Sequence, residues 1–234
     1  MIKKFVFAAA FALAPLVANA ADLPRKAPVA YVDPVYNWTG FYAGGSIGFG
    51  TAQNTYEDLD DWYNGYGARY THAKVGAVFG GQLGYNFQSG HWVYGVETDM
   101  HYNTAKLTAV VNTCNSECAG VNTNANWMGS VRGRIGWAQD KTLFYVTGGL
   151  AYGNPDSKWY ENSNPNEFNR TGWRVGYAVG GGVEYALSRQ WSLRGEAIYY
   201  DLGSQNVTGI TETSYNMRVS NNQIIGLFGA NYHF

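Results

Sequence analysis

The last eleven residues of the chain alternate between apolar and more polar side chains, and this pattern constrains the fold more than any other feature. Every second residue can face an apolar environment: Phe234, Tyr232, Ala230, Phe228, Gly226 and Ile224. A period of two over this length is that of a strand whose two faces meet different surroundings. A membrane-crossing strand needs about 9–11 residues, whereas strands of soluble proteins usually have about 5–6. The pattern therefore predicts the closing strand of a membrane barrel.

Seven earlier segments repeat this alternation, at 40–50, 75–87, 92–101, 126–137, 143–153, 171–186 and 191–201. Long polar connections (51–74, 103–125, 154–170 and 203–221) alternate with short ones. In bacterial outer-membrane barrels the external loops are long and the periplasmic turns are short. The sequence therefore predicts an all-β fold over residues 37–234, an eight-stranded antiparallel up-and-down transmembrane β-barrel with short periplasmic turns and four long external loops. A soluble eight-stranded barrel is the alternative, and it would turn the aromatic faces inward.

The start of the chain has the pattern of an export signal. Lys3 and Lys4 precede an apolar run, and Ala18-Asn19-Ala20 is a small-x-small cleavage site. The run is shorter than the ~20 residues that a spanning helix needs. Residues 1–20 are therefore predicted to be a cleaved signal peptide, and the proline-containing residues 21–36 a periplasmic linker. Export with a barrel fold predicts the outer membrane as the location.

Composition limits the partners. The chain has 16 Lys and Arg against 17 Asp and Glu, which excludes the basic surface of a nucleic-acid-binding protein. Charged residues are only 14% of the chain, where about 25% is usual, and aromatic residues reach 16%. This balance fits a barrel whose outer face meets outer-membrane lipid and lipopolysaccharide.

Charged residues fall on the face opposite the apolar one in several predicted strands. The eight residues predicted to point inward are Glu97, Asp99, Glu184 and Glu196 with Arg132, Arg134, Arg174 and Arg194. An eight-stranded barrel is only wide enough for its own side chains, so these charges must pair at close range. We predict a salt-bridged plug, in which neutralising Arg132 alone destabilises the barrel more than neutralising it together with its acid partner. The alternative is a small porin or gated pore in which the same pairs exchange partners.

Three further features suggest chemistry outside the plug. Cys114 and Cys118 are predicted to form a disulfide, because the chain is exported. Among the aromatic residues of the predicted loops, His72 and Tyr70 could ligate the iron of hemin, although such residues also pack on one another. Serine and carboxylate residues share the inward faces with His101 and His233, but the sequence shows no catalytic or metal-ligating motif around them. We expect the protein not to be an enzyme and to need no cofactor.

Several motifs resemble one family in order and position. They are Asn37-Trp38-Thr39-Gly40-Phe41-Tyr42 with Gly44-Gly45, Gly95-Val96-Glu97, Arg132-Gly133-Arg134-Ile135-Gly136, Gly148-Gly149-Leu150-Ala151-Tyr152-Gly153 and the stretch from Gly226 to Phe234. They resemble the small alphaproteobacterial outer-membrane proteins of the RopB and outer-membrane immunogenic protein type.

The resemblance implies a fold similar to the transmembrane domain of OmpA and a role as a surface-exposed antigen that supports envelope integrity. Some relatives are called porins and some are described as binding hemin, and the family has no shared catalytic motif. The terminal strand, with Phe234, Tyr232 and Phe228, looks like the assembly signal that the barrel-assembly machinery reads. That machinery is thus the protein partner the resemblance implies.

Overall fold

The computed structural model describes residues 36–59, 67, 69–110, 119–161, 164–170, 172–208 and 216–234. The predicted signal peptide, nearly all of the linker, and Cys114 and Cys118 lie outside these residues. Residues 35–234 form one compact unit. None of the helices in the described part of the chain is long and apolar enough to cross a membrane.

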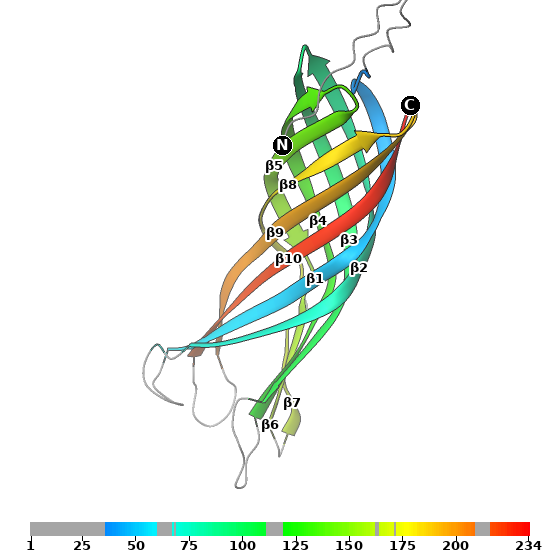
Figure 1. The fold of residues 1–234 in the computed structure, drawn as a ribbon. Helices are drawn as coiled ribbons and strands as arrows, with labels where there is room; N and C mark the ends of the chain where they lie inside the picture. The colour runs from blue at the N-terminus through cyan, green and yellow to red at the C-terminus, as the bar shows by residue number, and fades with distance from the viewer. Residues whose placement is uncertain are drawn as a thin grey trace, which may run out of the picture. The chain divides into compact units, whose positions relative to one another are not determined.

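Eight long strands close into an antiparallel barrel, and a short hairpin extends one side of it (Figure 1). The strands are β1 (Gly40–Asp58), β2 (Arg69–Ser89), β3 (Trp92–Val110), β4 (Ala119–Gln139), β5 (Thr142–Gly153), β6 (Asp156–Glu161), β7 (Asn164–Arg170), β8 (Arg174–Ala186), β9 (Trp191–Thr208) and β10 (Asn216–His233). The first and last strands pair, with Ile47 opposite Phe228, and this pairing closes the barrel. β6 continues the sheet beyond β5 by pairing with β4, and β7 pairs with β6. The eight-stranded antiparallel barrel predicted from the sequence is confirmed.

The side chains alternate between the lumen and the outer surface as predicted. On β10, Leu227 and Ile225 are buried in the lumen, whereas Phe228 and Ile224 are exposed on the outside. β5 has apolar residues at neighbouring positions, so its orientation is the least obvious from the sequence. Its Leu143 is fully buried while Phe144 is exposed, which agrees with the predicted orientation.

The predicted extent of three long loops is wrong. β1 and β2 still pair at Glu57 and Arg69, β3 and β4 at Val110 and Gly120, and β9 and β10 at Thr208 and Asn216. The fourth predicted loop, 154–170, contains β6 and β7. Beyond the bilayer the outward face of a strand meets water instead of lipid, so it no longer has to be apolar, although inward residues such as Ala52 and Tyr56 stay buried. The backbone groups still need hydrogen-bond partners, and the ladder continues.

The outer surface carries an apolar band between two rings of aromatic side chains. The ring near the short turns includes Tyr85, Phe87, Trp92, Tyr94, Trp137, Phe144, Tyr185 and Trp191, and the ring toward the long connections includes Phe79, Tyr102, Trp127, Tyr152, Trp173, Tyr177 and Tyr199. Aromatic girdles at both interfaces are typical of outer-membrane barrels, whose short turns face the periplasm. The C-terminus lies at the short-turn end, and the β6–β7 hairpin lies at the opposite, external end (Figure 1).

Candidate functional site

A network of charged side chains fills the middle of the lumen, with Arg132 of β4 at its centre. Arg132 Nη2 lies 2.7 Å from Glu97 Oε1 and 3.0 Å from Asp99 Oδ2, and its Nη1 lies 2.9 Å from Glu196 Oε1. The acids come from β3 and β9, so this single guanidinium joins two walls of the barrel. All four side chains are almost completely buried.

Two further arginines extend the network. Arg194 Nη1 lies 2.7 Å from Glu97 Oε2, and Arg194 Nη2 also pairs with Glu196. Arg134 Nη2 lies 3.0 Å from Glu184 Oε2, and its Nη1 is 3.8 Å from Glu97 Oε2. The structure thus brings together seven of the eight charged residues that the sequence places in the lumen.

Arg174 is the eighth, and it lies elsewhere in the lumen. It begins β8 at the external end, opposite Gly153, and is 9% exposed. Glu184, which belongs to the network, lies on the same strand face about ten residues further, or roughly 33 Å along an extended strand. Arg174 points inward as the alternation places it, but it has interactions of its own. The predicted balance of four acids and four bases within one cluster is therefore wrong. Alternation along a strand predicts which face a side chain is on, but it does not predict how far along the barrel axis the side chain lies.

Neutral side chains complete the network, and the sequence analysis did not assign them to it. The Tyr42 hydroxyl donates to Glu97 Oε2 at 2.7 Å and accepts from Arg134 Nη1 at 3.0 Å. The Tyr200 hydroxyl donates to Asp99 Oδ1 at 3.0 Å, and the Ser130 hydroxyl also donates to Asp99. The Arg134 guanidinium carbon lies 4.0 Å from the centroid of the Tyr145 ring, a cation–π contact. The sequence feature that could have identified these neutral residues is their position on the inward faces of the predicted strands.

Both inward-facing histidines contact a serine and a carboxylate. His101 Nδ1 is 3.2 Å from Asp99 Oδ1 and its Nε2 is 3.0 Å from Ser46 Oγ. His233 Nε2 is 3.0 Å from Ser192 Oγ and 3.4 Å from Glu184 Oε1. The first set has the residue types of a nucleophilic triad. However, His101 is 1% exposed, so this set is buried in the lumen and not at the surface.

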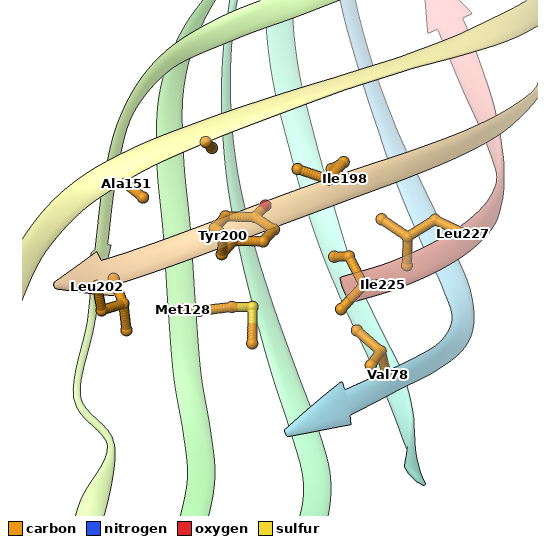
Figure 2. Close-up of a cluster of buried hydrophobic side chains, with 9 residues drawn as sticks. Val78, Met128, Ala151, Ile198, Tyr200, Leu202, Ile225 and Leu227 are labelled. Carbon is orange, nitrogen blue, oxygen red and sulfur yellow. The ribbon is translucent and has the colours of Figure 1, made fainter. Parts of the chain in front are cut away.

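An apolar layer covers the network on its external side. Its residues come from six strands: Val78, Met128, Ala151, Ala178, Ile198, Tyr200, Leu202, Ile225 and Leu227. Figure 2 shows these side chains gathered around the Tyr200 ring. The hydroxyl of the same ring reaches Asp99, so the apolar layer lies directly on the charged network.

A second apolar layer closes the periplasmic end. It consists of Trp38, Val93, Ala138, Leu143, Tyr145 and Ala186. Trp38 is fully buried, its backbone N–H donates to Gln88 Oε1 at 2.8 Å, and its ring lies 5.8 Å from that of His233. Tyr36, at the end of the predicted linker, packs against Trp38 with ring centroids 4.7 Å apart. Burial, together with the nearby Glu184 charge, raises the pKa of Tyr36 to about 12.

Gly84 makes room for one of the network residues. It lies opposite Tyr42 in the β1–β2 register, and a Cβ at this position would lie 2.8 Å from Tyr42 Cε1. We expect Gly84→Ala to displace the Tyr42 hydroxyl from Glu97 and to lower the free energy of unfolding by about 1–3 kcal/mol, as overpacking usually does. Urea unfolding in detergent micelles measures this loss.

The matched control is Gly226→Ala on the outer face of β10. A Cβ there would meet nothing within 4 Å, so the variant should be as stable as the wild type. Equal stability of the two variants would show that the Tyr42 position does not depend on Gly84.

The other predicted site residues lie away from the lumen network. His72 is part-buried on β2 opposite Asn54, and Tyr70 lies opposite Tyr56. Phe228 and Phe234 are exposed on the outside, and the Phe234 N–H donates to Phe41 O at 3.0 Å. Within the described residues, no three His, Cys, Asp or Glu side chains are placed to hold a metal ion.

A closed antiparallel barrel with an apolar outer band, two aromatic girdles and a charged network buried in its lumen defines an integral β-barrel membrane protein. The family model of the outer membrane protein beta-barrel domain matches residues 5–234, and the chain belongs to this family. It is therefore an outer-membrane protein.

Curated relatives cover most of the chain. The 31 kDa outer-membrane immunogenic protein of Brucella melitensis is 30% identical, over 97% of this chain and 96% of the relative. The 22 kDa outer membrane protein of Rhizobium leguminosarum is 35% identical, over 78% of this chain and 71% of the relative. These relatives are named for their location and antigenicity, which agrees with the family resemblance found in the sequence.

Two solved barrels share the fold at low sequence identity. The outer membrane protease OmpT of Escherichia coli matches with a TM-score of 0.51 at 8% identity, over 85% of this chain and 98% of that one. OprG of Pseudomonas aeruginosa matches with a TM-score of 0.50 at 12% identity, over the same shares of the two chains. Likeness at this level of identity concerns the fold alone.

Proposed function

We propose that the protein is a structural, non-enzymatic component of the outer membrane whose lumen does not conduct and whose external strands form a surface antigen. The observation that carries this proposal is the charged network between two apolar layers. The charged network and the apolar layers would each restrict the passage of ions through the barrel, and they do so by different physical effects.

The network opposes conduction because its charges are mutually satisfied. An ion passing through would have to separate Arg132 from its three carboxylates in a buried site. Separating one partner from a buried ion pair usually costs about 3–5 kcal/mol. The apolar layers add a second barrier, because narrow hydrophobic constrictions exclude water and ions together.

The external end supports the surface-antigen part of the proposal. β1–β2, β3–β4 and β9–β10 continue pairing well beyond the external girdle, and the β6–β7 hairpin lies at the same end. A rigid β-structure above the bilayer presents fixed backbone shapes to antibodies. The relatives from Brucella are named immunogenic proteins, which is consistent with this role.

Conductance across a planar bilayer tests the proposal. We expect no stable openings from the folded wild type, with folding checked by its altered migration on unheated gels and insertion checked by protease protection. Reproducible single-channel openings would instead favour the small-porin alternative, in which the pairs around Arg132 exchange partners.

A further inference from the structure

The charges of the lumen network do not balance among its ion-paired residues. Four carboxylates, Glu97, Asp99, Glu184 and Glu196, are connected to three guanidinium groups, those of Arg132, Arg134 and Arg194. The cluster therefore carries one excess negative charge if both of its histidines are neutral. A net charge sealed away from water is strongly unfavourable, so a positive charge within the same cluster is expected.

Among the four carboxylates of the network, Asp99 is the one whose charge is least compensated by arginine. The guanidinium that reaches it, that of Arg132, also contacts Glu97 and Glu196. Its other partners include the neutral hydroxyls of Tyr200 and Ser130, and the ring of His101. Glu184, beside the second histidine, faces Arg134 at 3.0 Å, which reaches Glu97 only at 3.8 Å. The excess charge is therefore concentrated at Asp99, next to His101.

A chain of hydrogen bonds across the lumen gives a second argument for the proton positions, which does not use this charge count. It begins at Glu184, whose carboxylate can only accept, so Asn231 must present its amide Nδ2 there, at 2.7 Å. Asn231 Oδ1 then faces Gln82 and accepts from Gln82 Nε2 at 2.8 Å. Gln82 Oε1 is thereby turned toward Ser46, whose hydroxyl donates to it at 3.3 Å.

The end of this chain determines the state of the imidazole. Gln82 Oε1 can only accept, so we assign the single Ser46 hydroxyl proton to it, and Ser46 Oγ then accepts from His101 Nε2 at 3.0 Å. Asp99 Oδ1 also accepts, from His101 Nδ1 at 3.2 Å. Both ring nitrogens then carry a proton. We propose that His101 is a buried imidazolium, so that the closed barrel binds one proton between Asp99 and Ser46.

The surroundings of His101 agree with a positive charge. The groups around it are Asp99 on its own strand, Ser46 from β1 and Gln82 from β2, while Arg132 from β4 and Tyr200 from β9 reach it through Asp99. The charged group in contact with the ring is the Asp99 carboxylate, whose other oxygen lies 3.0 Å from Arg132 Nη2. The proposal deepens the sealed-lumen function and rests on it, because free exchange with water would remove the need for charge balance.

Nitrogen NMR of the full chain with 15N-labelled histidine in detergent micelles tests the proposal. At pH 7 an ordinary histidine is mostly neutral. We expect one of the four imidazoles to show the chemical shifts of a ring protonated at both nitrogens. His72→Gln, His91→Gln and His233→Gln should each leave this signal in place, and Asp99→Asn should abolish it.

A neutral His101 at pH 7 would overturn the proposal, as would assignment of the doubly protonated ring to His233. If Asp99→Asn fails to fold, the wild-type spectrum with the three histidine variants still decides, because it assigns the signal by elimination. Conductance separates this result from the proposed function. Channel openings together with a doubly protonated His101 would contradict the sealed lumen but not the proton site. Absence of conductance together with a neutral His101 would contradict the proton site but not the sealed lumen.

Discussion

Replacing Arg132 with methionine is expected to lower the free energy of unfolding by about 3–5 kcal/mol, the usual loss when one partner of a buried ion pair is removed. Arg132 contacts Glu97, Asp99 and Glu196, and the substitution leaves all three carboxylates in the lumen with less positive charge. Methionine fills most of the volume, so the loss measures charge rather than a cavity. Urea unfolding from micelles, followed by tryptophan fluorescence and by gel migration without heating, gives the free energy.

A double variant and a surface variant serve as controls. Arg132→Met combined with Glu196→Gln removes one charge of each sign, and it should recover much of the lost stability. Arg218→Met breaks a pair with Glu57 in which the arginine side chain is 43% exposed, and it should cost at most about 1 kcal/mol. If R132M lost no more than the double variant, the network would not be tightly coupled.

Replacing Trp38 with alanine is expected to cost about 3–5 kcal/mol, the usual range for removing a fully buried aromatic side chain. Trp38 lies in the centre of the periplasmic apolar layer, against Tyr36 and His233. Its loss leaves a cavity on the periplasmic side of the charged network. The same unfolding experiment measures the effect. The W38A barrel should also unfold in detergent at a lower temperature than the wild type.

Trp173→Ala is the matched control for size and residue type. Trp173 is 62% exposed on the outer surface, so its removal leaves no internal cavity. We expect a much smaller change in unfolding free energy, within about 1 kcal/mol of the wild type. Similar losses for the two tryptophans would mean that Trp38 is not a structural part of the lumen filling.

The sequence predicted the barrel because lipid and a filled lumen impose opposite requirements on neighbouring residues. Phe228 and Leu227 are adjacent in the chain and both apolar, yet the eleven-residue alternation around them placed one outside and one inside. The strand ends were not predictable in the same way. At Glu57 and Arg69 the outward face meets water and carries polar side chains, so the apolar half of the alternation is missing while the backbone ladder continues.

The sequence predicted which charged residues point into the lumen, but not which of them contact one another. Parity placed Arg174 and Glu184 on one face of β8, but only strand tilt and stagger decide which residues of different strands share a depth. The partners of Arg132 come from β3 and β9, which are far apart in the chain. The role of His101 depends on the amide orientations of Asn231 and Gln82, and these follow from contacts between three different strands.

The pairing of β1 with β10 closes the barrel by joining the first and last strands of the chain's described part. The Phe234 N–H donates to Phe41 O across this seam at 3.0 Å. The salt bridges from β3 and β4 to β9 span long stretches of sequence, and such nonlocal contacts form slowly. A slip of one residue at the seam would turn Phe228 inward and Leu227 toward lipid. Only the correct register satisfies Glu184 through Asn231 of β10, so the polar contacts of the lumen distinguish a finished barrel from a mispaired one.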